Sequence, residues 1–268
     1  MDIASQEDKR GIYLNNVGIT NLMIPIAVRD RSIHRNMQYT IGTFNAFVDL
    51  LPEVRGTHMS RIVQMLYKHR NSISQEGIRD LLKDLIIELF ATTSRVEIDF
   101  PYFTEDYSPM SELENLTTHQ AHFEGKCWVT TFKEETDFHY VFRLGAKVDI
   151  MSVCPCALEE CGNGNSHVQR GCINISVEPK DGAWIWLEDL IEIAQVSGSA
   201  PIFDRLKRPD EKYVVQQGFK NAKFVEDICR DVVTALKRRD DIAAYKVTVE
   251  NFESIHSHNA YAEVSEKW

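Results

Sequence analysis

The segment TNLMIPIAVRDRSIHRNMQYTIGTFNAFVDL, residues 20–50, contains the pattern from which the fold is predicted. Two runs rich in β-branched and aromatic residues, 20–30 and 38–50, have the length of strands and are separated by a polar segment. Such a pair is typical of a β-hairpin, with the chain reversing at His34 to Asn36. The segment therefore predicts two antiparallel strands early in the fold.

Helical periodicity follows this hairpin. A helix is predicted at 58–67, and a second one begins at Ser74, after which apolar residues recur at intervals of three and four. Ser74 is a suitable N-cap because its side-chain oxygen can accept a hydrogen bond from the first turn. Two strands are then predicted at 95–103 and 117–132. The first half of the chain thus has the element order β-β-α-α-β-β.

The second half repeats that order of elements, although the residues themselves do not visibly align. The predicted elements are strand 138–152, strand 169–178, helix 187–196, helix 223–238, strand 245–252 and strand 258–264. Long antiparallel strands with paired helices on one face belong to the α+β class. We therefore predict two tandem modules, 1–133 and 134–268.

The composition is that of an ordinary globular protein, because 43% of the 268 residues are hydrophobic and 26% are charged. The formal net charge of −10 argues against generic binding to nucleic acid, but it allows a local cationic pocket for an anionic small molecule. No apolar run approaches the roughly 18 residues of a membrane-spanning helix. Six cysteines are too few for a disulfide scaffold and the first ten residues have no apolar leader, so a cytoplasmic location is expected.

The stretch SVCPCALEECGNGNSHVQRG, residues 152–171, is the most informative part of the chain for chemistry. Cys154, Cys156 and Cys161 precede His167 there, so that thiolates and an imidazole can converge at the end of a predicted strand. The spacing is not that of a closed structural zinc site, which needs a second cysteine pair. A metal site and a group of small buried thiols fit this pattern about equally well.

A second group lies in NFESIHSHNAY, residues 251–261. His256 and His258 are two positions apart and would share one face of a strand, while Glu253 lies just across the turn. A carboxylate beside imidazoles is typical of general acid and base catalysis near neutral pH. Pairs of histidines are also common in exposed hairpin turns, so the pattern alone leaves both interpretations open.

Three further motifs carry charged side chains. A proline marks RPDE, which ends at Glu211, as a turn and makes Glu211 a solvated loop acid in the simplest interpretation. Glu226 lies in the first turns of a helix, where the helix dipole favours an acid. The segment GTHMSR, which contains His58 and Arg61, is either a helix start that binds phosphate or a helix capped by Thr57.

Taken together, six motifs resemble those of prokaryotic type IB GTP cyclohydrolase I, in order and over essentially the whole chain. They are LPEVRGTHMSR from Leu51, CPC from Cys154, HVQR from His167, RPDE from Arg208, NAKFVED from Asn221 and ESIHSH from Glu253. The resemblance implies the tunnelling fold, in which a β-β-α-α-β-β module is used twice per subunit. It also implies a homotetramer with active sites at subunit interfaces.

The resemblance also implies roles for individual residues. It implies a metal held by Cys154, His167 and Glu211, with a water molecule in the open position. The segment between CPC and HVQR is one residue longer than usual, which makes Cys161 an alternative ligand. Zinc, manganese and ferrous iron all suit a set of one thiolate, one imidazole and one carboxylate.

The remaining roles concern the substrate GTP. The resemblance implies that Glu226 accepts hydrogen bonds from the guanine edge, and we assign His58 and Arg61 to substrate binding as well. Catalytic positions are matched by Cys154 and by four further residues: Cys156, Glu253, His256 and His258.

The reaction implied is the hydrolytic opening of the GTP imidazole ring at C8, followed by loss of formate, rearrangement of the ribose and closure to 7,8-dihydroneopterin triphosphate. The product would feed the synthesis of tetrahydrofolate or of a modified tRNA base of the queuosine type. Three alternatives on the same fold are an NADPH-dependent nitrile reductase with a nucleophilic cysteine, an archaeal-type cyclohydrolase that forms a cyclic phosphate, and a non-catalytic protein that binds purines or pterins.

Overall fold

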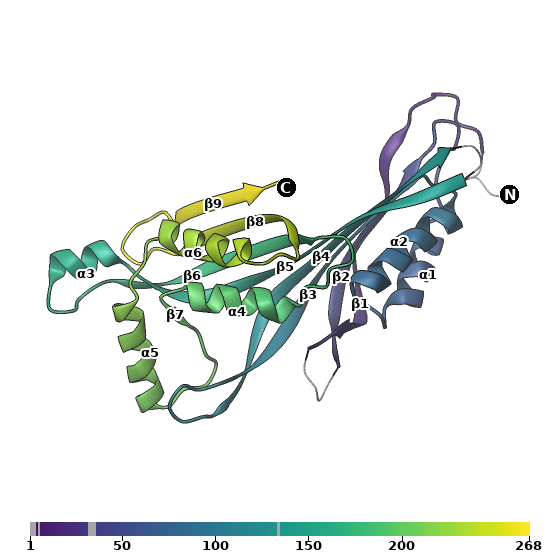
Figure 1. Cartoon of the computed structure of the whole chain (residues 1–268). Helices are drawn as coiled ribbons and strands as arrows, with labels where there is room; N and C mark the ends of the chain where they lie inside the picture. Colours follow the sequence, from purple (N-terminus) through teal and green to yellow (C-terminus); the bar gives the residue numbers. More distant parts are fainter. Residues whose placement is uncertain (1–3, 5, 32–35, 133–134) are drawn as a thin grey trace. The chain divides into compact units, whose positions relative to one another are not determined.

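The computed structural model describes residue 4 and residues 6–31, 36–132 and 135–268 (Figure 1). Contacts between residues divide the chain into two compact units. Unit 1 comprises Met1–Pro101 and His122–Arg143, and unit 2 comprises Tyr102–Ala121 and Leu144–Trp268. Three long strands contribute residues to both units: β3 (Thr93–Tyr107), β4 (Glu114–Phe132) and β5 (Glu135–Val153).

Unit 1 begins with the antiparallel strands β1 (Leu14–Arg29) and β2 (Met37–Leu50). The two predicted strands of the hairpin are confirmed, whereas residues 34 and 35 of its predicted turn lie outside the described residues. β1 starts earlier than predicted, because its first residues pair with the end of β2. Those first residues are mostly exposed and lack apolar alternation, so the sequence pattern does not reveal them.

Two helices cover one face of the strands of unit 1, namely α1 (Met59–His69) and α2 (Gln75–Leu89) (Figure 1). The predicted cap of the second helix is confirmed, because the backbone N–H of Gly77 donates to Ser74 Oγ at 3.1 Å. Five of the repeating apolar residues of α2 are buried, as their spacing requires: Ile78, Leu81, Leu82, Leu85 and Ile86.

Gly125 of β4 allows α2 to pack closely on this face. A Cβ atom at this position would lie 2.6 Å from Ile78 Cγ2 and 2.8 Å from Leu82 Cδ1, closer than real contacts allow. The neighbouring β4 residues on the same side, Phe123 and Cys127, are also buried. Because side chains alternate along a strand, the residues between them point to the face without helices.

Unit 2 contains the second set of elements. They are α3 (Pro155–Cys161), β6 (Val168–Pro179), α4 (Leu187–Ser197), β7 (Ala200–Pro201), α5 (Arg208–Lys220), α6 (Val225–Lys237), β8 (Ile242–Asn251) and β9 (Ala260–Glu266). The strand order here is β5-β6-β8-β9, all neighbours being antiparallel, and the short β7 pairs with β5.

This architecture confirms the predicted α+β class with two β-β-α-α-β-β sets, the second of which carries α3, β7 and α5 as additions. The predicted boundary of the two modules, between residues 133 and 134, lies outside the described residues and stays a prediction. Among the helices of the described residues, none combines the length and the apolar character needed to cross a membrane.

The prediction of a turn at RPDE is wrong, because these residues form the first turn of α5. Pro209 lies at the start of this helix, where its missing N–H would have no partner within the helix anyway. The carboxylate of Asp210 accepts a hydrogen bond from the backbone N–H of Lys207 at 2.8 Å and so caps the helix. Glu211 therefore lies on a helix and not in a loop.

Candidate active site

Cys154 and His167 face each other at the ends of two paired strands. The antiparallel register of β5 and β6 ends with Val153 opposite Val168, and the backbone N–H of Cys154 donates to the carbonyl oxygen of His167 at 3.4 Å. Ser166 Oγ supports this end by donating to the carbonyl oxygen of Cys154 at 2.7 Å. The backbones of Cys154 and His167 are thus held side by side just beyond the last strand pair.

The segment between these two residues consists of a short helix and a tight turn. Cys154 is the N-cap of α3, while the other two cysteines of the motif, Cys156 and Cys161, are exposed on that helix. After α3 the residues Gly162, Asn163 and Gly164 all have φ between 52° and 74°. Glycine and asparagine adopt this left-handed region most readily, which explains the unusual composition of the turn.

His167 belongs to a small polar network with Gln169 and Glu253. His167 Nδ1 lies 2.8 Å from Gln169 Oε1, and Gln169 Nε2 donates to Glu253 Oε1 at 3.3 Å. Because an amide oxygen only accepts, Nδ1 is the donor in this arrangement, and Nε2 is the nitrogen left to face a ligand. The side chain of His167 is 13% exposed and that of Glu253 is 11% exposed. The network therefore fixes the tautomer that suits a metal ligand.

One carboxylate oxygen of Glu253 makes no hydrogen bond in this network. Its Oε2 is buried without a hydrogen-bond partner and lies 3.7 Å from His167 Nδ1, too far for a hydrogen bond. A buried carboxylate oxygen without a partner is costly and is typical of a site that awaits a ligand or a proton. Sequence reasoning assigned Glu253 to catalysis but did not place it beside His167, because the two residues lie 86 positions apart.

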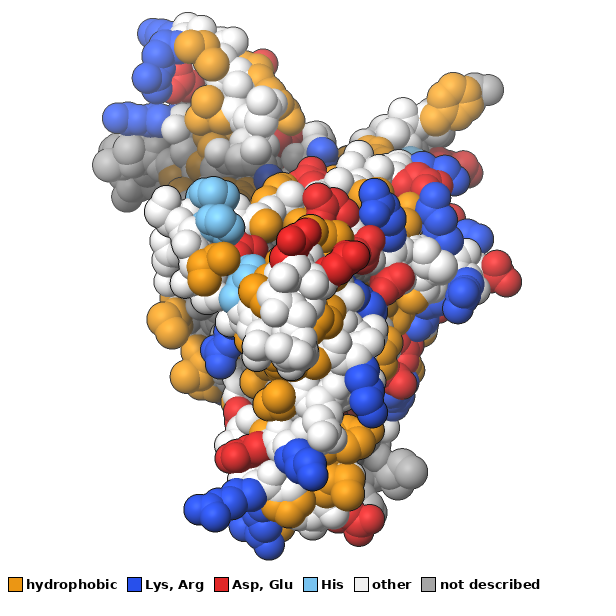
Figure 2. All heavy atoms as spheres, turned by 90° about the vertical axis from the view of Figure 1, so that its left-hand side faces the viewer, with side chains coloured by type: hydrophobic (Ala, Val, Ile, Leu, Met, Phe, Trp, Pro, Cys, Tyr) orange, Lys and Arg blue, Asp and Glu red, His pale blue; other side chains and the backbone are white. Residues whose placement is uncertain are grey.

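His256 and His258 do not share the face of a strand, and the strand predicted at 258–264 begins only at Ala260, as β9. His256 and His258 lie in the loop between β8 and β9, because pairing of these strands stops at Asn251 opposite Ala260. Their rings nevertheless stack, with centroids 5.4 Å apart and an interplanar angle of 19°. Both side chains are exposed, and Figure 2 shows histidines at the surface close to acidic side chains.

Glu211 is exposed in the first turn of α5, next to the buried Asp210. Asp210 anchors the helix start, because it accepts hydrogen bonds from the backbone N–H groups of Met110 and Ser111, both at 2.8 Å, and from Ser111 Oγ at 2.6 Å. Burial alone would raise the pKa of Asp210, but these hydrogen bonds and that from Lys207 hold it well below its usual range. This anchoring role of Asp210 was not identified from the sequence, although the position of Asp210 directly before the candidate ligand Glu211 could have indicated it.

The predicted metal ligands are brought together only in part. Cys154 and His167 are neighbours, whereas Glu211 is not grouped with them. In the part of the chain that the structure describes, no three histidine, cysteine, aspartate or glutamate side chains are close enough together to hold a metal ion. The three-ligand set therefore stays a prediction.

Glu226 is exposed in the first turn of α6, and no described residue forms a hydrogen bond or an ion pair with it. The neighbouring Asp227 caps the helix instead, because it accepts a hydrogen bond from the backbone N–H of Phe224 at 3.1 Å. The carboxylate of Glu226 is thus available to a ligand.

The two candidate substrate residues of unit 1 lie on α1. His58 is the N-cap residue of α1, and no side-chain cap is formed there, so capping by Thr57 is not found. Arg61 Nη1 donates to the carbonyl oxygen of Glu88 at 3.3 Å, which links α1 to α2. Arg61 therefore has a packing role in addition to any contact with substrate.

Comparison with known proteins agrees with these motifs. A model of the family described as type I GTP cyclohydrolase folE2 matches residues 1–262. The chain belongs to this family. GTP cyclohydrolase FolE2 of Thermosipho africanus is 42% identical over 261 residues, which make up 97% of this chain and 96% of that protein. GTP cyclohydrolase FolE2 of Pseudothermotoga lettingae is 41% identical over the same shares of the two chains.

Solved structures show the same fold in more distant proteins. Urate oxidase from Bacillus subtilis superposes with a TM-score of 0.54, covering 94% of this chain and 98% of that chain at 8% identity. A highly active mutant of urate oxidase from Bacillus sp. TB-90 gives a TM-score of 0.57, covering 95% and 99% of the two chains at 7% identity. At this identity the likeness concerns the fold alone, and it confirms the tunnelling fold expected from the sequence motifs of this family.

Proposed function

We propose that the protein is a GTP cyclohydrolase that converts GTP and water to 7,8-dihydroneopterin triphosphate and formate. The observation that carries this proposal is the placement of Cys154 beside His167 at the end of paired strands, with Gln169 and Glu253 orienting the imidazole of His167. The chain also matches the cyclohydrolase family over residues 1–262. The product would feed the synthesis of tetrahydrofolate or of a modified tRNA base. We expect the reaction to take place in the cytoplasm.

The chemistry of the predicted ligands suits a divalent metal ion, although the described residues do not group Glu211 with Cys154 and His167. Cys154, His167 and Glu211 supply a thiolate, an imidazole and a carboxylate, which suits zinc, manganese or ferrous iron. His167 can offer Nε2, because Gln169 engages Nδ1 at 2.8 Å. Such an ion, when bound with one open position, supplies Lewis acidity that makes water a nucleophile near neutral pH. Cys161 is exposed at the end of α3 and is the alternative thiol ligand.

The other residues of the site bind GTP and move protons. Glu226 accepts the N–H donors of the guanine edge and so orients the ring for attack at C8. The exposed pair His256 and His258 donates and accepts protons during ring opening and rearrangement of the ribose, which require groups that titrate near neutral pH. Glu253, with one buried oxygen free, and Cys156 on α3 are further proton carriers for these steps.

The test is to incubate the purified protein with GTP and each candidate metal, and to measure formate and a pterin that becomes fluorescent after oxidation. We expect both products in a fixed ratio, and we expect a chelator to abolish them while the circular dichroism spectrum is unchanged. His167→Ala should remove both products as well. Oxidation of NADPH without formate, or no turnover of GTP with any metal, would contradict the proposal.

A further inference from the structure

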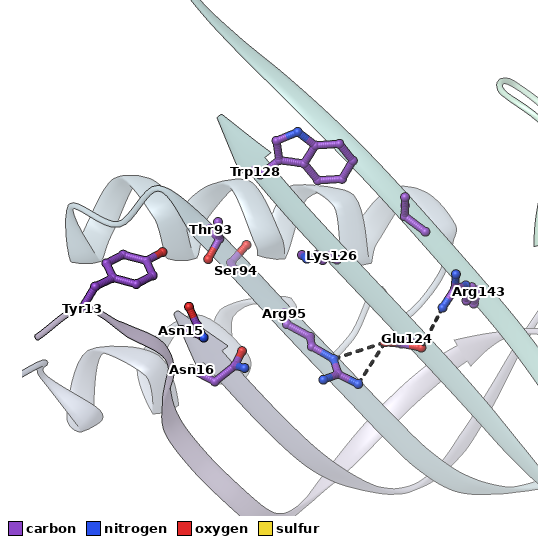
Figure 3. A pocket seen from close by; sticks show the side chains of 11 residues that line it. Tyr13, Asn15, Asn16, Thr93, Ser94, Arg95, Glu124, Lys126, Trp128 and Arg143 are labelled. Carbon is purple, nitrogen blue, oxygen red and sulfur yellow. Dashed lines mark hydrogen bonds and ion pairs between the residues drawn. The ribbon is translucent and has the colours of Figure 1, made fainter. Parts of the chain in front are cut away.

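A pocket of about 640 Å³ lies in unit 1 and contains none of the residues assigned to catalysis or to the metal (Figure 3). Its volume falls within the range of about 300–1,000 Å³ that is typical of small-molecule sites. It is lined by residues of β1, β3, β4 and β5 and by the residue before β1: Tyr13, Asn15, Asn16, Thr93, Ser94, Arg95, Glu124, Lys126, Trp128, Val141 and Arg143.

Strand β4 supplies the central row of this pocket. Glu124, Lys126 and Trp128 alternate with the buried residues that face the helices, and they therefore point to the face without helices (Figure 3). Successive residues on one face of a strand are about 7 Å apart. A ring and a charged group of one small ligand can therefore contact Trp128 and Lys126 together.

Two arginines from the neighbouring strands are held in place by Glu124. Arg95 Nη2 lies 3.1 Å from Glu124 Oε1, and Arg143 Nη1 lies 3.8 Å from Glu124 Oε2 (Figure 3). Arg95 also pairs with Glu97 on its own strand. The carboxylate of Glu124 thus keeps two guanidinium groups at the same wall of the pocket.

The pocket lining carries more positive than negative charge. Three basic side chains, Arg95, Lys126 and Arg143, line it together with one carboxylate, that of Glu124, although the whole chain has a net charge of −10. No residue in the described part of the chain forms an ion pair or a hydrogen bond with Lys126. Clustered cations attract anions, and a lysine ammonium is a common ligand of phosphate.

Trp128 gives the pocket an aromatic wall. Its ring stacks on His139 with centroids 5.5 Å apart and an interplanar angle of 21°, so the indole is held in a fixed orientation. An aromatic ring of this kind can stack on any flat heterocycle, whatever substituents the heterocycle carries. The amides of Asn15 and Asn16 and the hydroxyl of Thr93 add hydrogen-bonding groups to the same lining.

We propose that this pocket binds a phosphorylated planar heterocycle at a site additional to the catalytic one, with the ring on Trp128 and the phosphate on Lys126 and the two arginines. GTP and its pterin product both belong to this chemical class, and the choice of ligand rests on the proposed function. A site of this kind allows the concentration of substrate or product to be sensed by unit 1.

The test is equilibrium dialysis of the full-length protein, as purified, with 8-oxo-GTP. This nucleotide carries a carbonyl group at C8, so formate cannot be released from it. We expect two bound molecules per chain. Lys126→Ala should weaken one class of sites at least about tenfold, because it removes a charged hydrogen bond, whereas Glu226→Gln should weaken the other class.

A second probe, inorganic triphosphate, separates the phosphate from the ring. Lys126→Ala should weaken the binding of both probes to the pocket, whereas Trp128→Leu should weaken only that of the nucleotide. Lys83→Ala is the matched control, because Lys83 is an exposed lysine on α2, on the opposite face of unit 1, and its loss changes the charge equally. This control should bind both probes like the wild type.

The proposal is overturned by a single bound nucleotide per chain, or by wild-type binding in Lys126→Ala. It is also overturned when Lys126→Ala and Glu226→Gln weaken one and the same class of sites. Formate release from GTP is measured separately on the wild type. Two binding classes without formate would contradict the proposed function and leave the pocket standing, so the two failures are distinguishable.

Discussion

At the scale of single residues, Asp49 is a buried carboxylate of unit 1 that accepts several hydrogen bonds. It is 3% exposed and accepts hydrogen bonds from Thr92 N at 2.8 Å, Thr93 N at 2.7 Å and the hydroxyl of Tyr13 at 2.9 Å. Burial alone would raise the pKa of Asp49, but the hydrogen bonds from Thr92 and Thr93 outweigh it and lower the pKa. The charged form is thus preferred in the folded state.

Asp49→Asn should therefore lower the free energy of unfolding by about 1–3 kcal/mol at pH 7, because buried donors lose a charged acceptor. A lowered pKa in the folded state stabilises the protein above the ordinary aspartate pKa near 3.8, and that stabilisation is lost as the pH falls through the folded-state pKa. The difference between wild type and variant should accordingly shrink below about pH 4. Urea denaturation at several pH values measures the free energy of unfolding of both proteins. A difference between them that stays constant down to pH 3 would contradict the argument.

Glu226 and Asp227 are adjacent carboxylates on α6 that offer a matched comparison. Glu226→Gln should weaken GTP binding by about 2–5 kcal/mol, because one partner of a charged contact with the guanine edge is lost. Asp227→Asn should leave GTP affinity unchanged and lower the melting temperature, since its carboxylate is engaged by Phe224 N. Calorimetric titration with 8-oxo-GTP and a thermal melt provide both readouts. Equal GTP affinity in Glu226→Gln and the wild type would assign Glu226 to the helix dipole alone.

At the scale of secondary-structure elements, the sequence predicts α2 correctly and misses α5, and the reason is physical. α2 buries a regular apolar stripe, whereas the fully buried residues of α5 are only Asp210 and Gly218. A helix that is anchored by a buried carboxylate has no regular spacing of apolar residues, so its sequence lacks the usual helical signal. The sequence also does not reveal that His167 lies near Glu253, because the residue just before β6 and the loop after β8 come together only through the order of the strands.

The dependence of α5 on Asp210 leads to a prediction for the element as a whole. Asp210→Asn should lower the melting temperature of the metal-free protein by several degrees, because the first turn of α5 loses its anchor on Met110 and Ser111. It should also weaken metal binding, since Glu211 is the next residue. Glu211→Gln should weaken metal binding to a similar extent without changing that melting temperature.

These two readouts are a thermal melt and the metal content after dialysis against a weak chelator. They separate the anchoring role of Asp210 from the ligand role of Glu211. Full metal content in Glu211→Gln would remove Glu211 from the ligand set and leave Cys161 as the candidate to test next.

At the scale of the whole molecule, the outermost strands β1 and β9 leave edges to which another strand can add. Among the described residues, β1 pairs with no strand except β2, although the backbone of Ala27 and Arg29 near its end bonds to Arg70 and Ile73, and β9 pairs with no strand except β8. Unpaired backbone groups along such an edge are available to a strand of another copy. We therefore expect a homotetramer, and light scattering should give four times the 30.8 kDa of one chain.

Active sites shared between subunits make a sharper prediction than mass alone. Glu226→Gln impairs the binding of guanine and His256→Ala impairs proton transfer, so each variant alone should release formate slowly, the latter about a hundredfold to ten-thousandfold below wild type. When the two variants are unfolded together and refolded as mixed tetramers, some sites receive an intact Glu226 and an intact His256 from different chains. If the two residues act across an interface, the mixture should therefore regain a measurable share of wild-type turnover, whereas each variant refolded by itself should not. A monomer with full activity, or mixed tetramers as slow as the parent variants, would place both residues of each site within one chain.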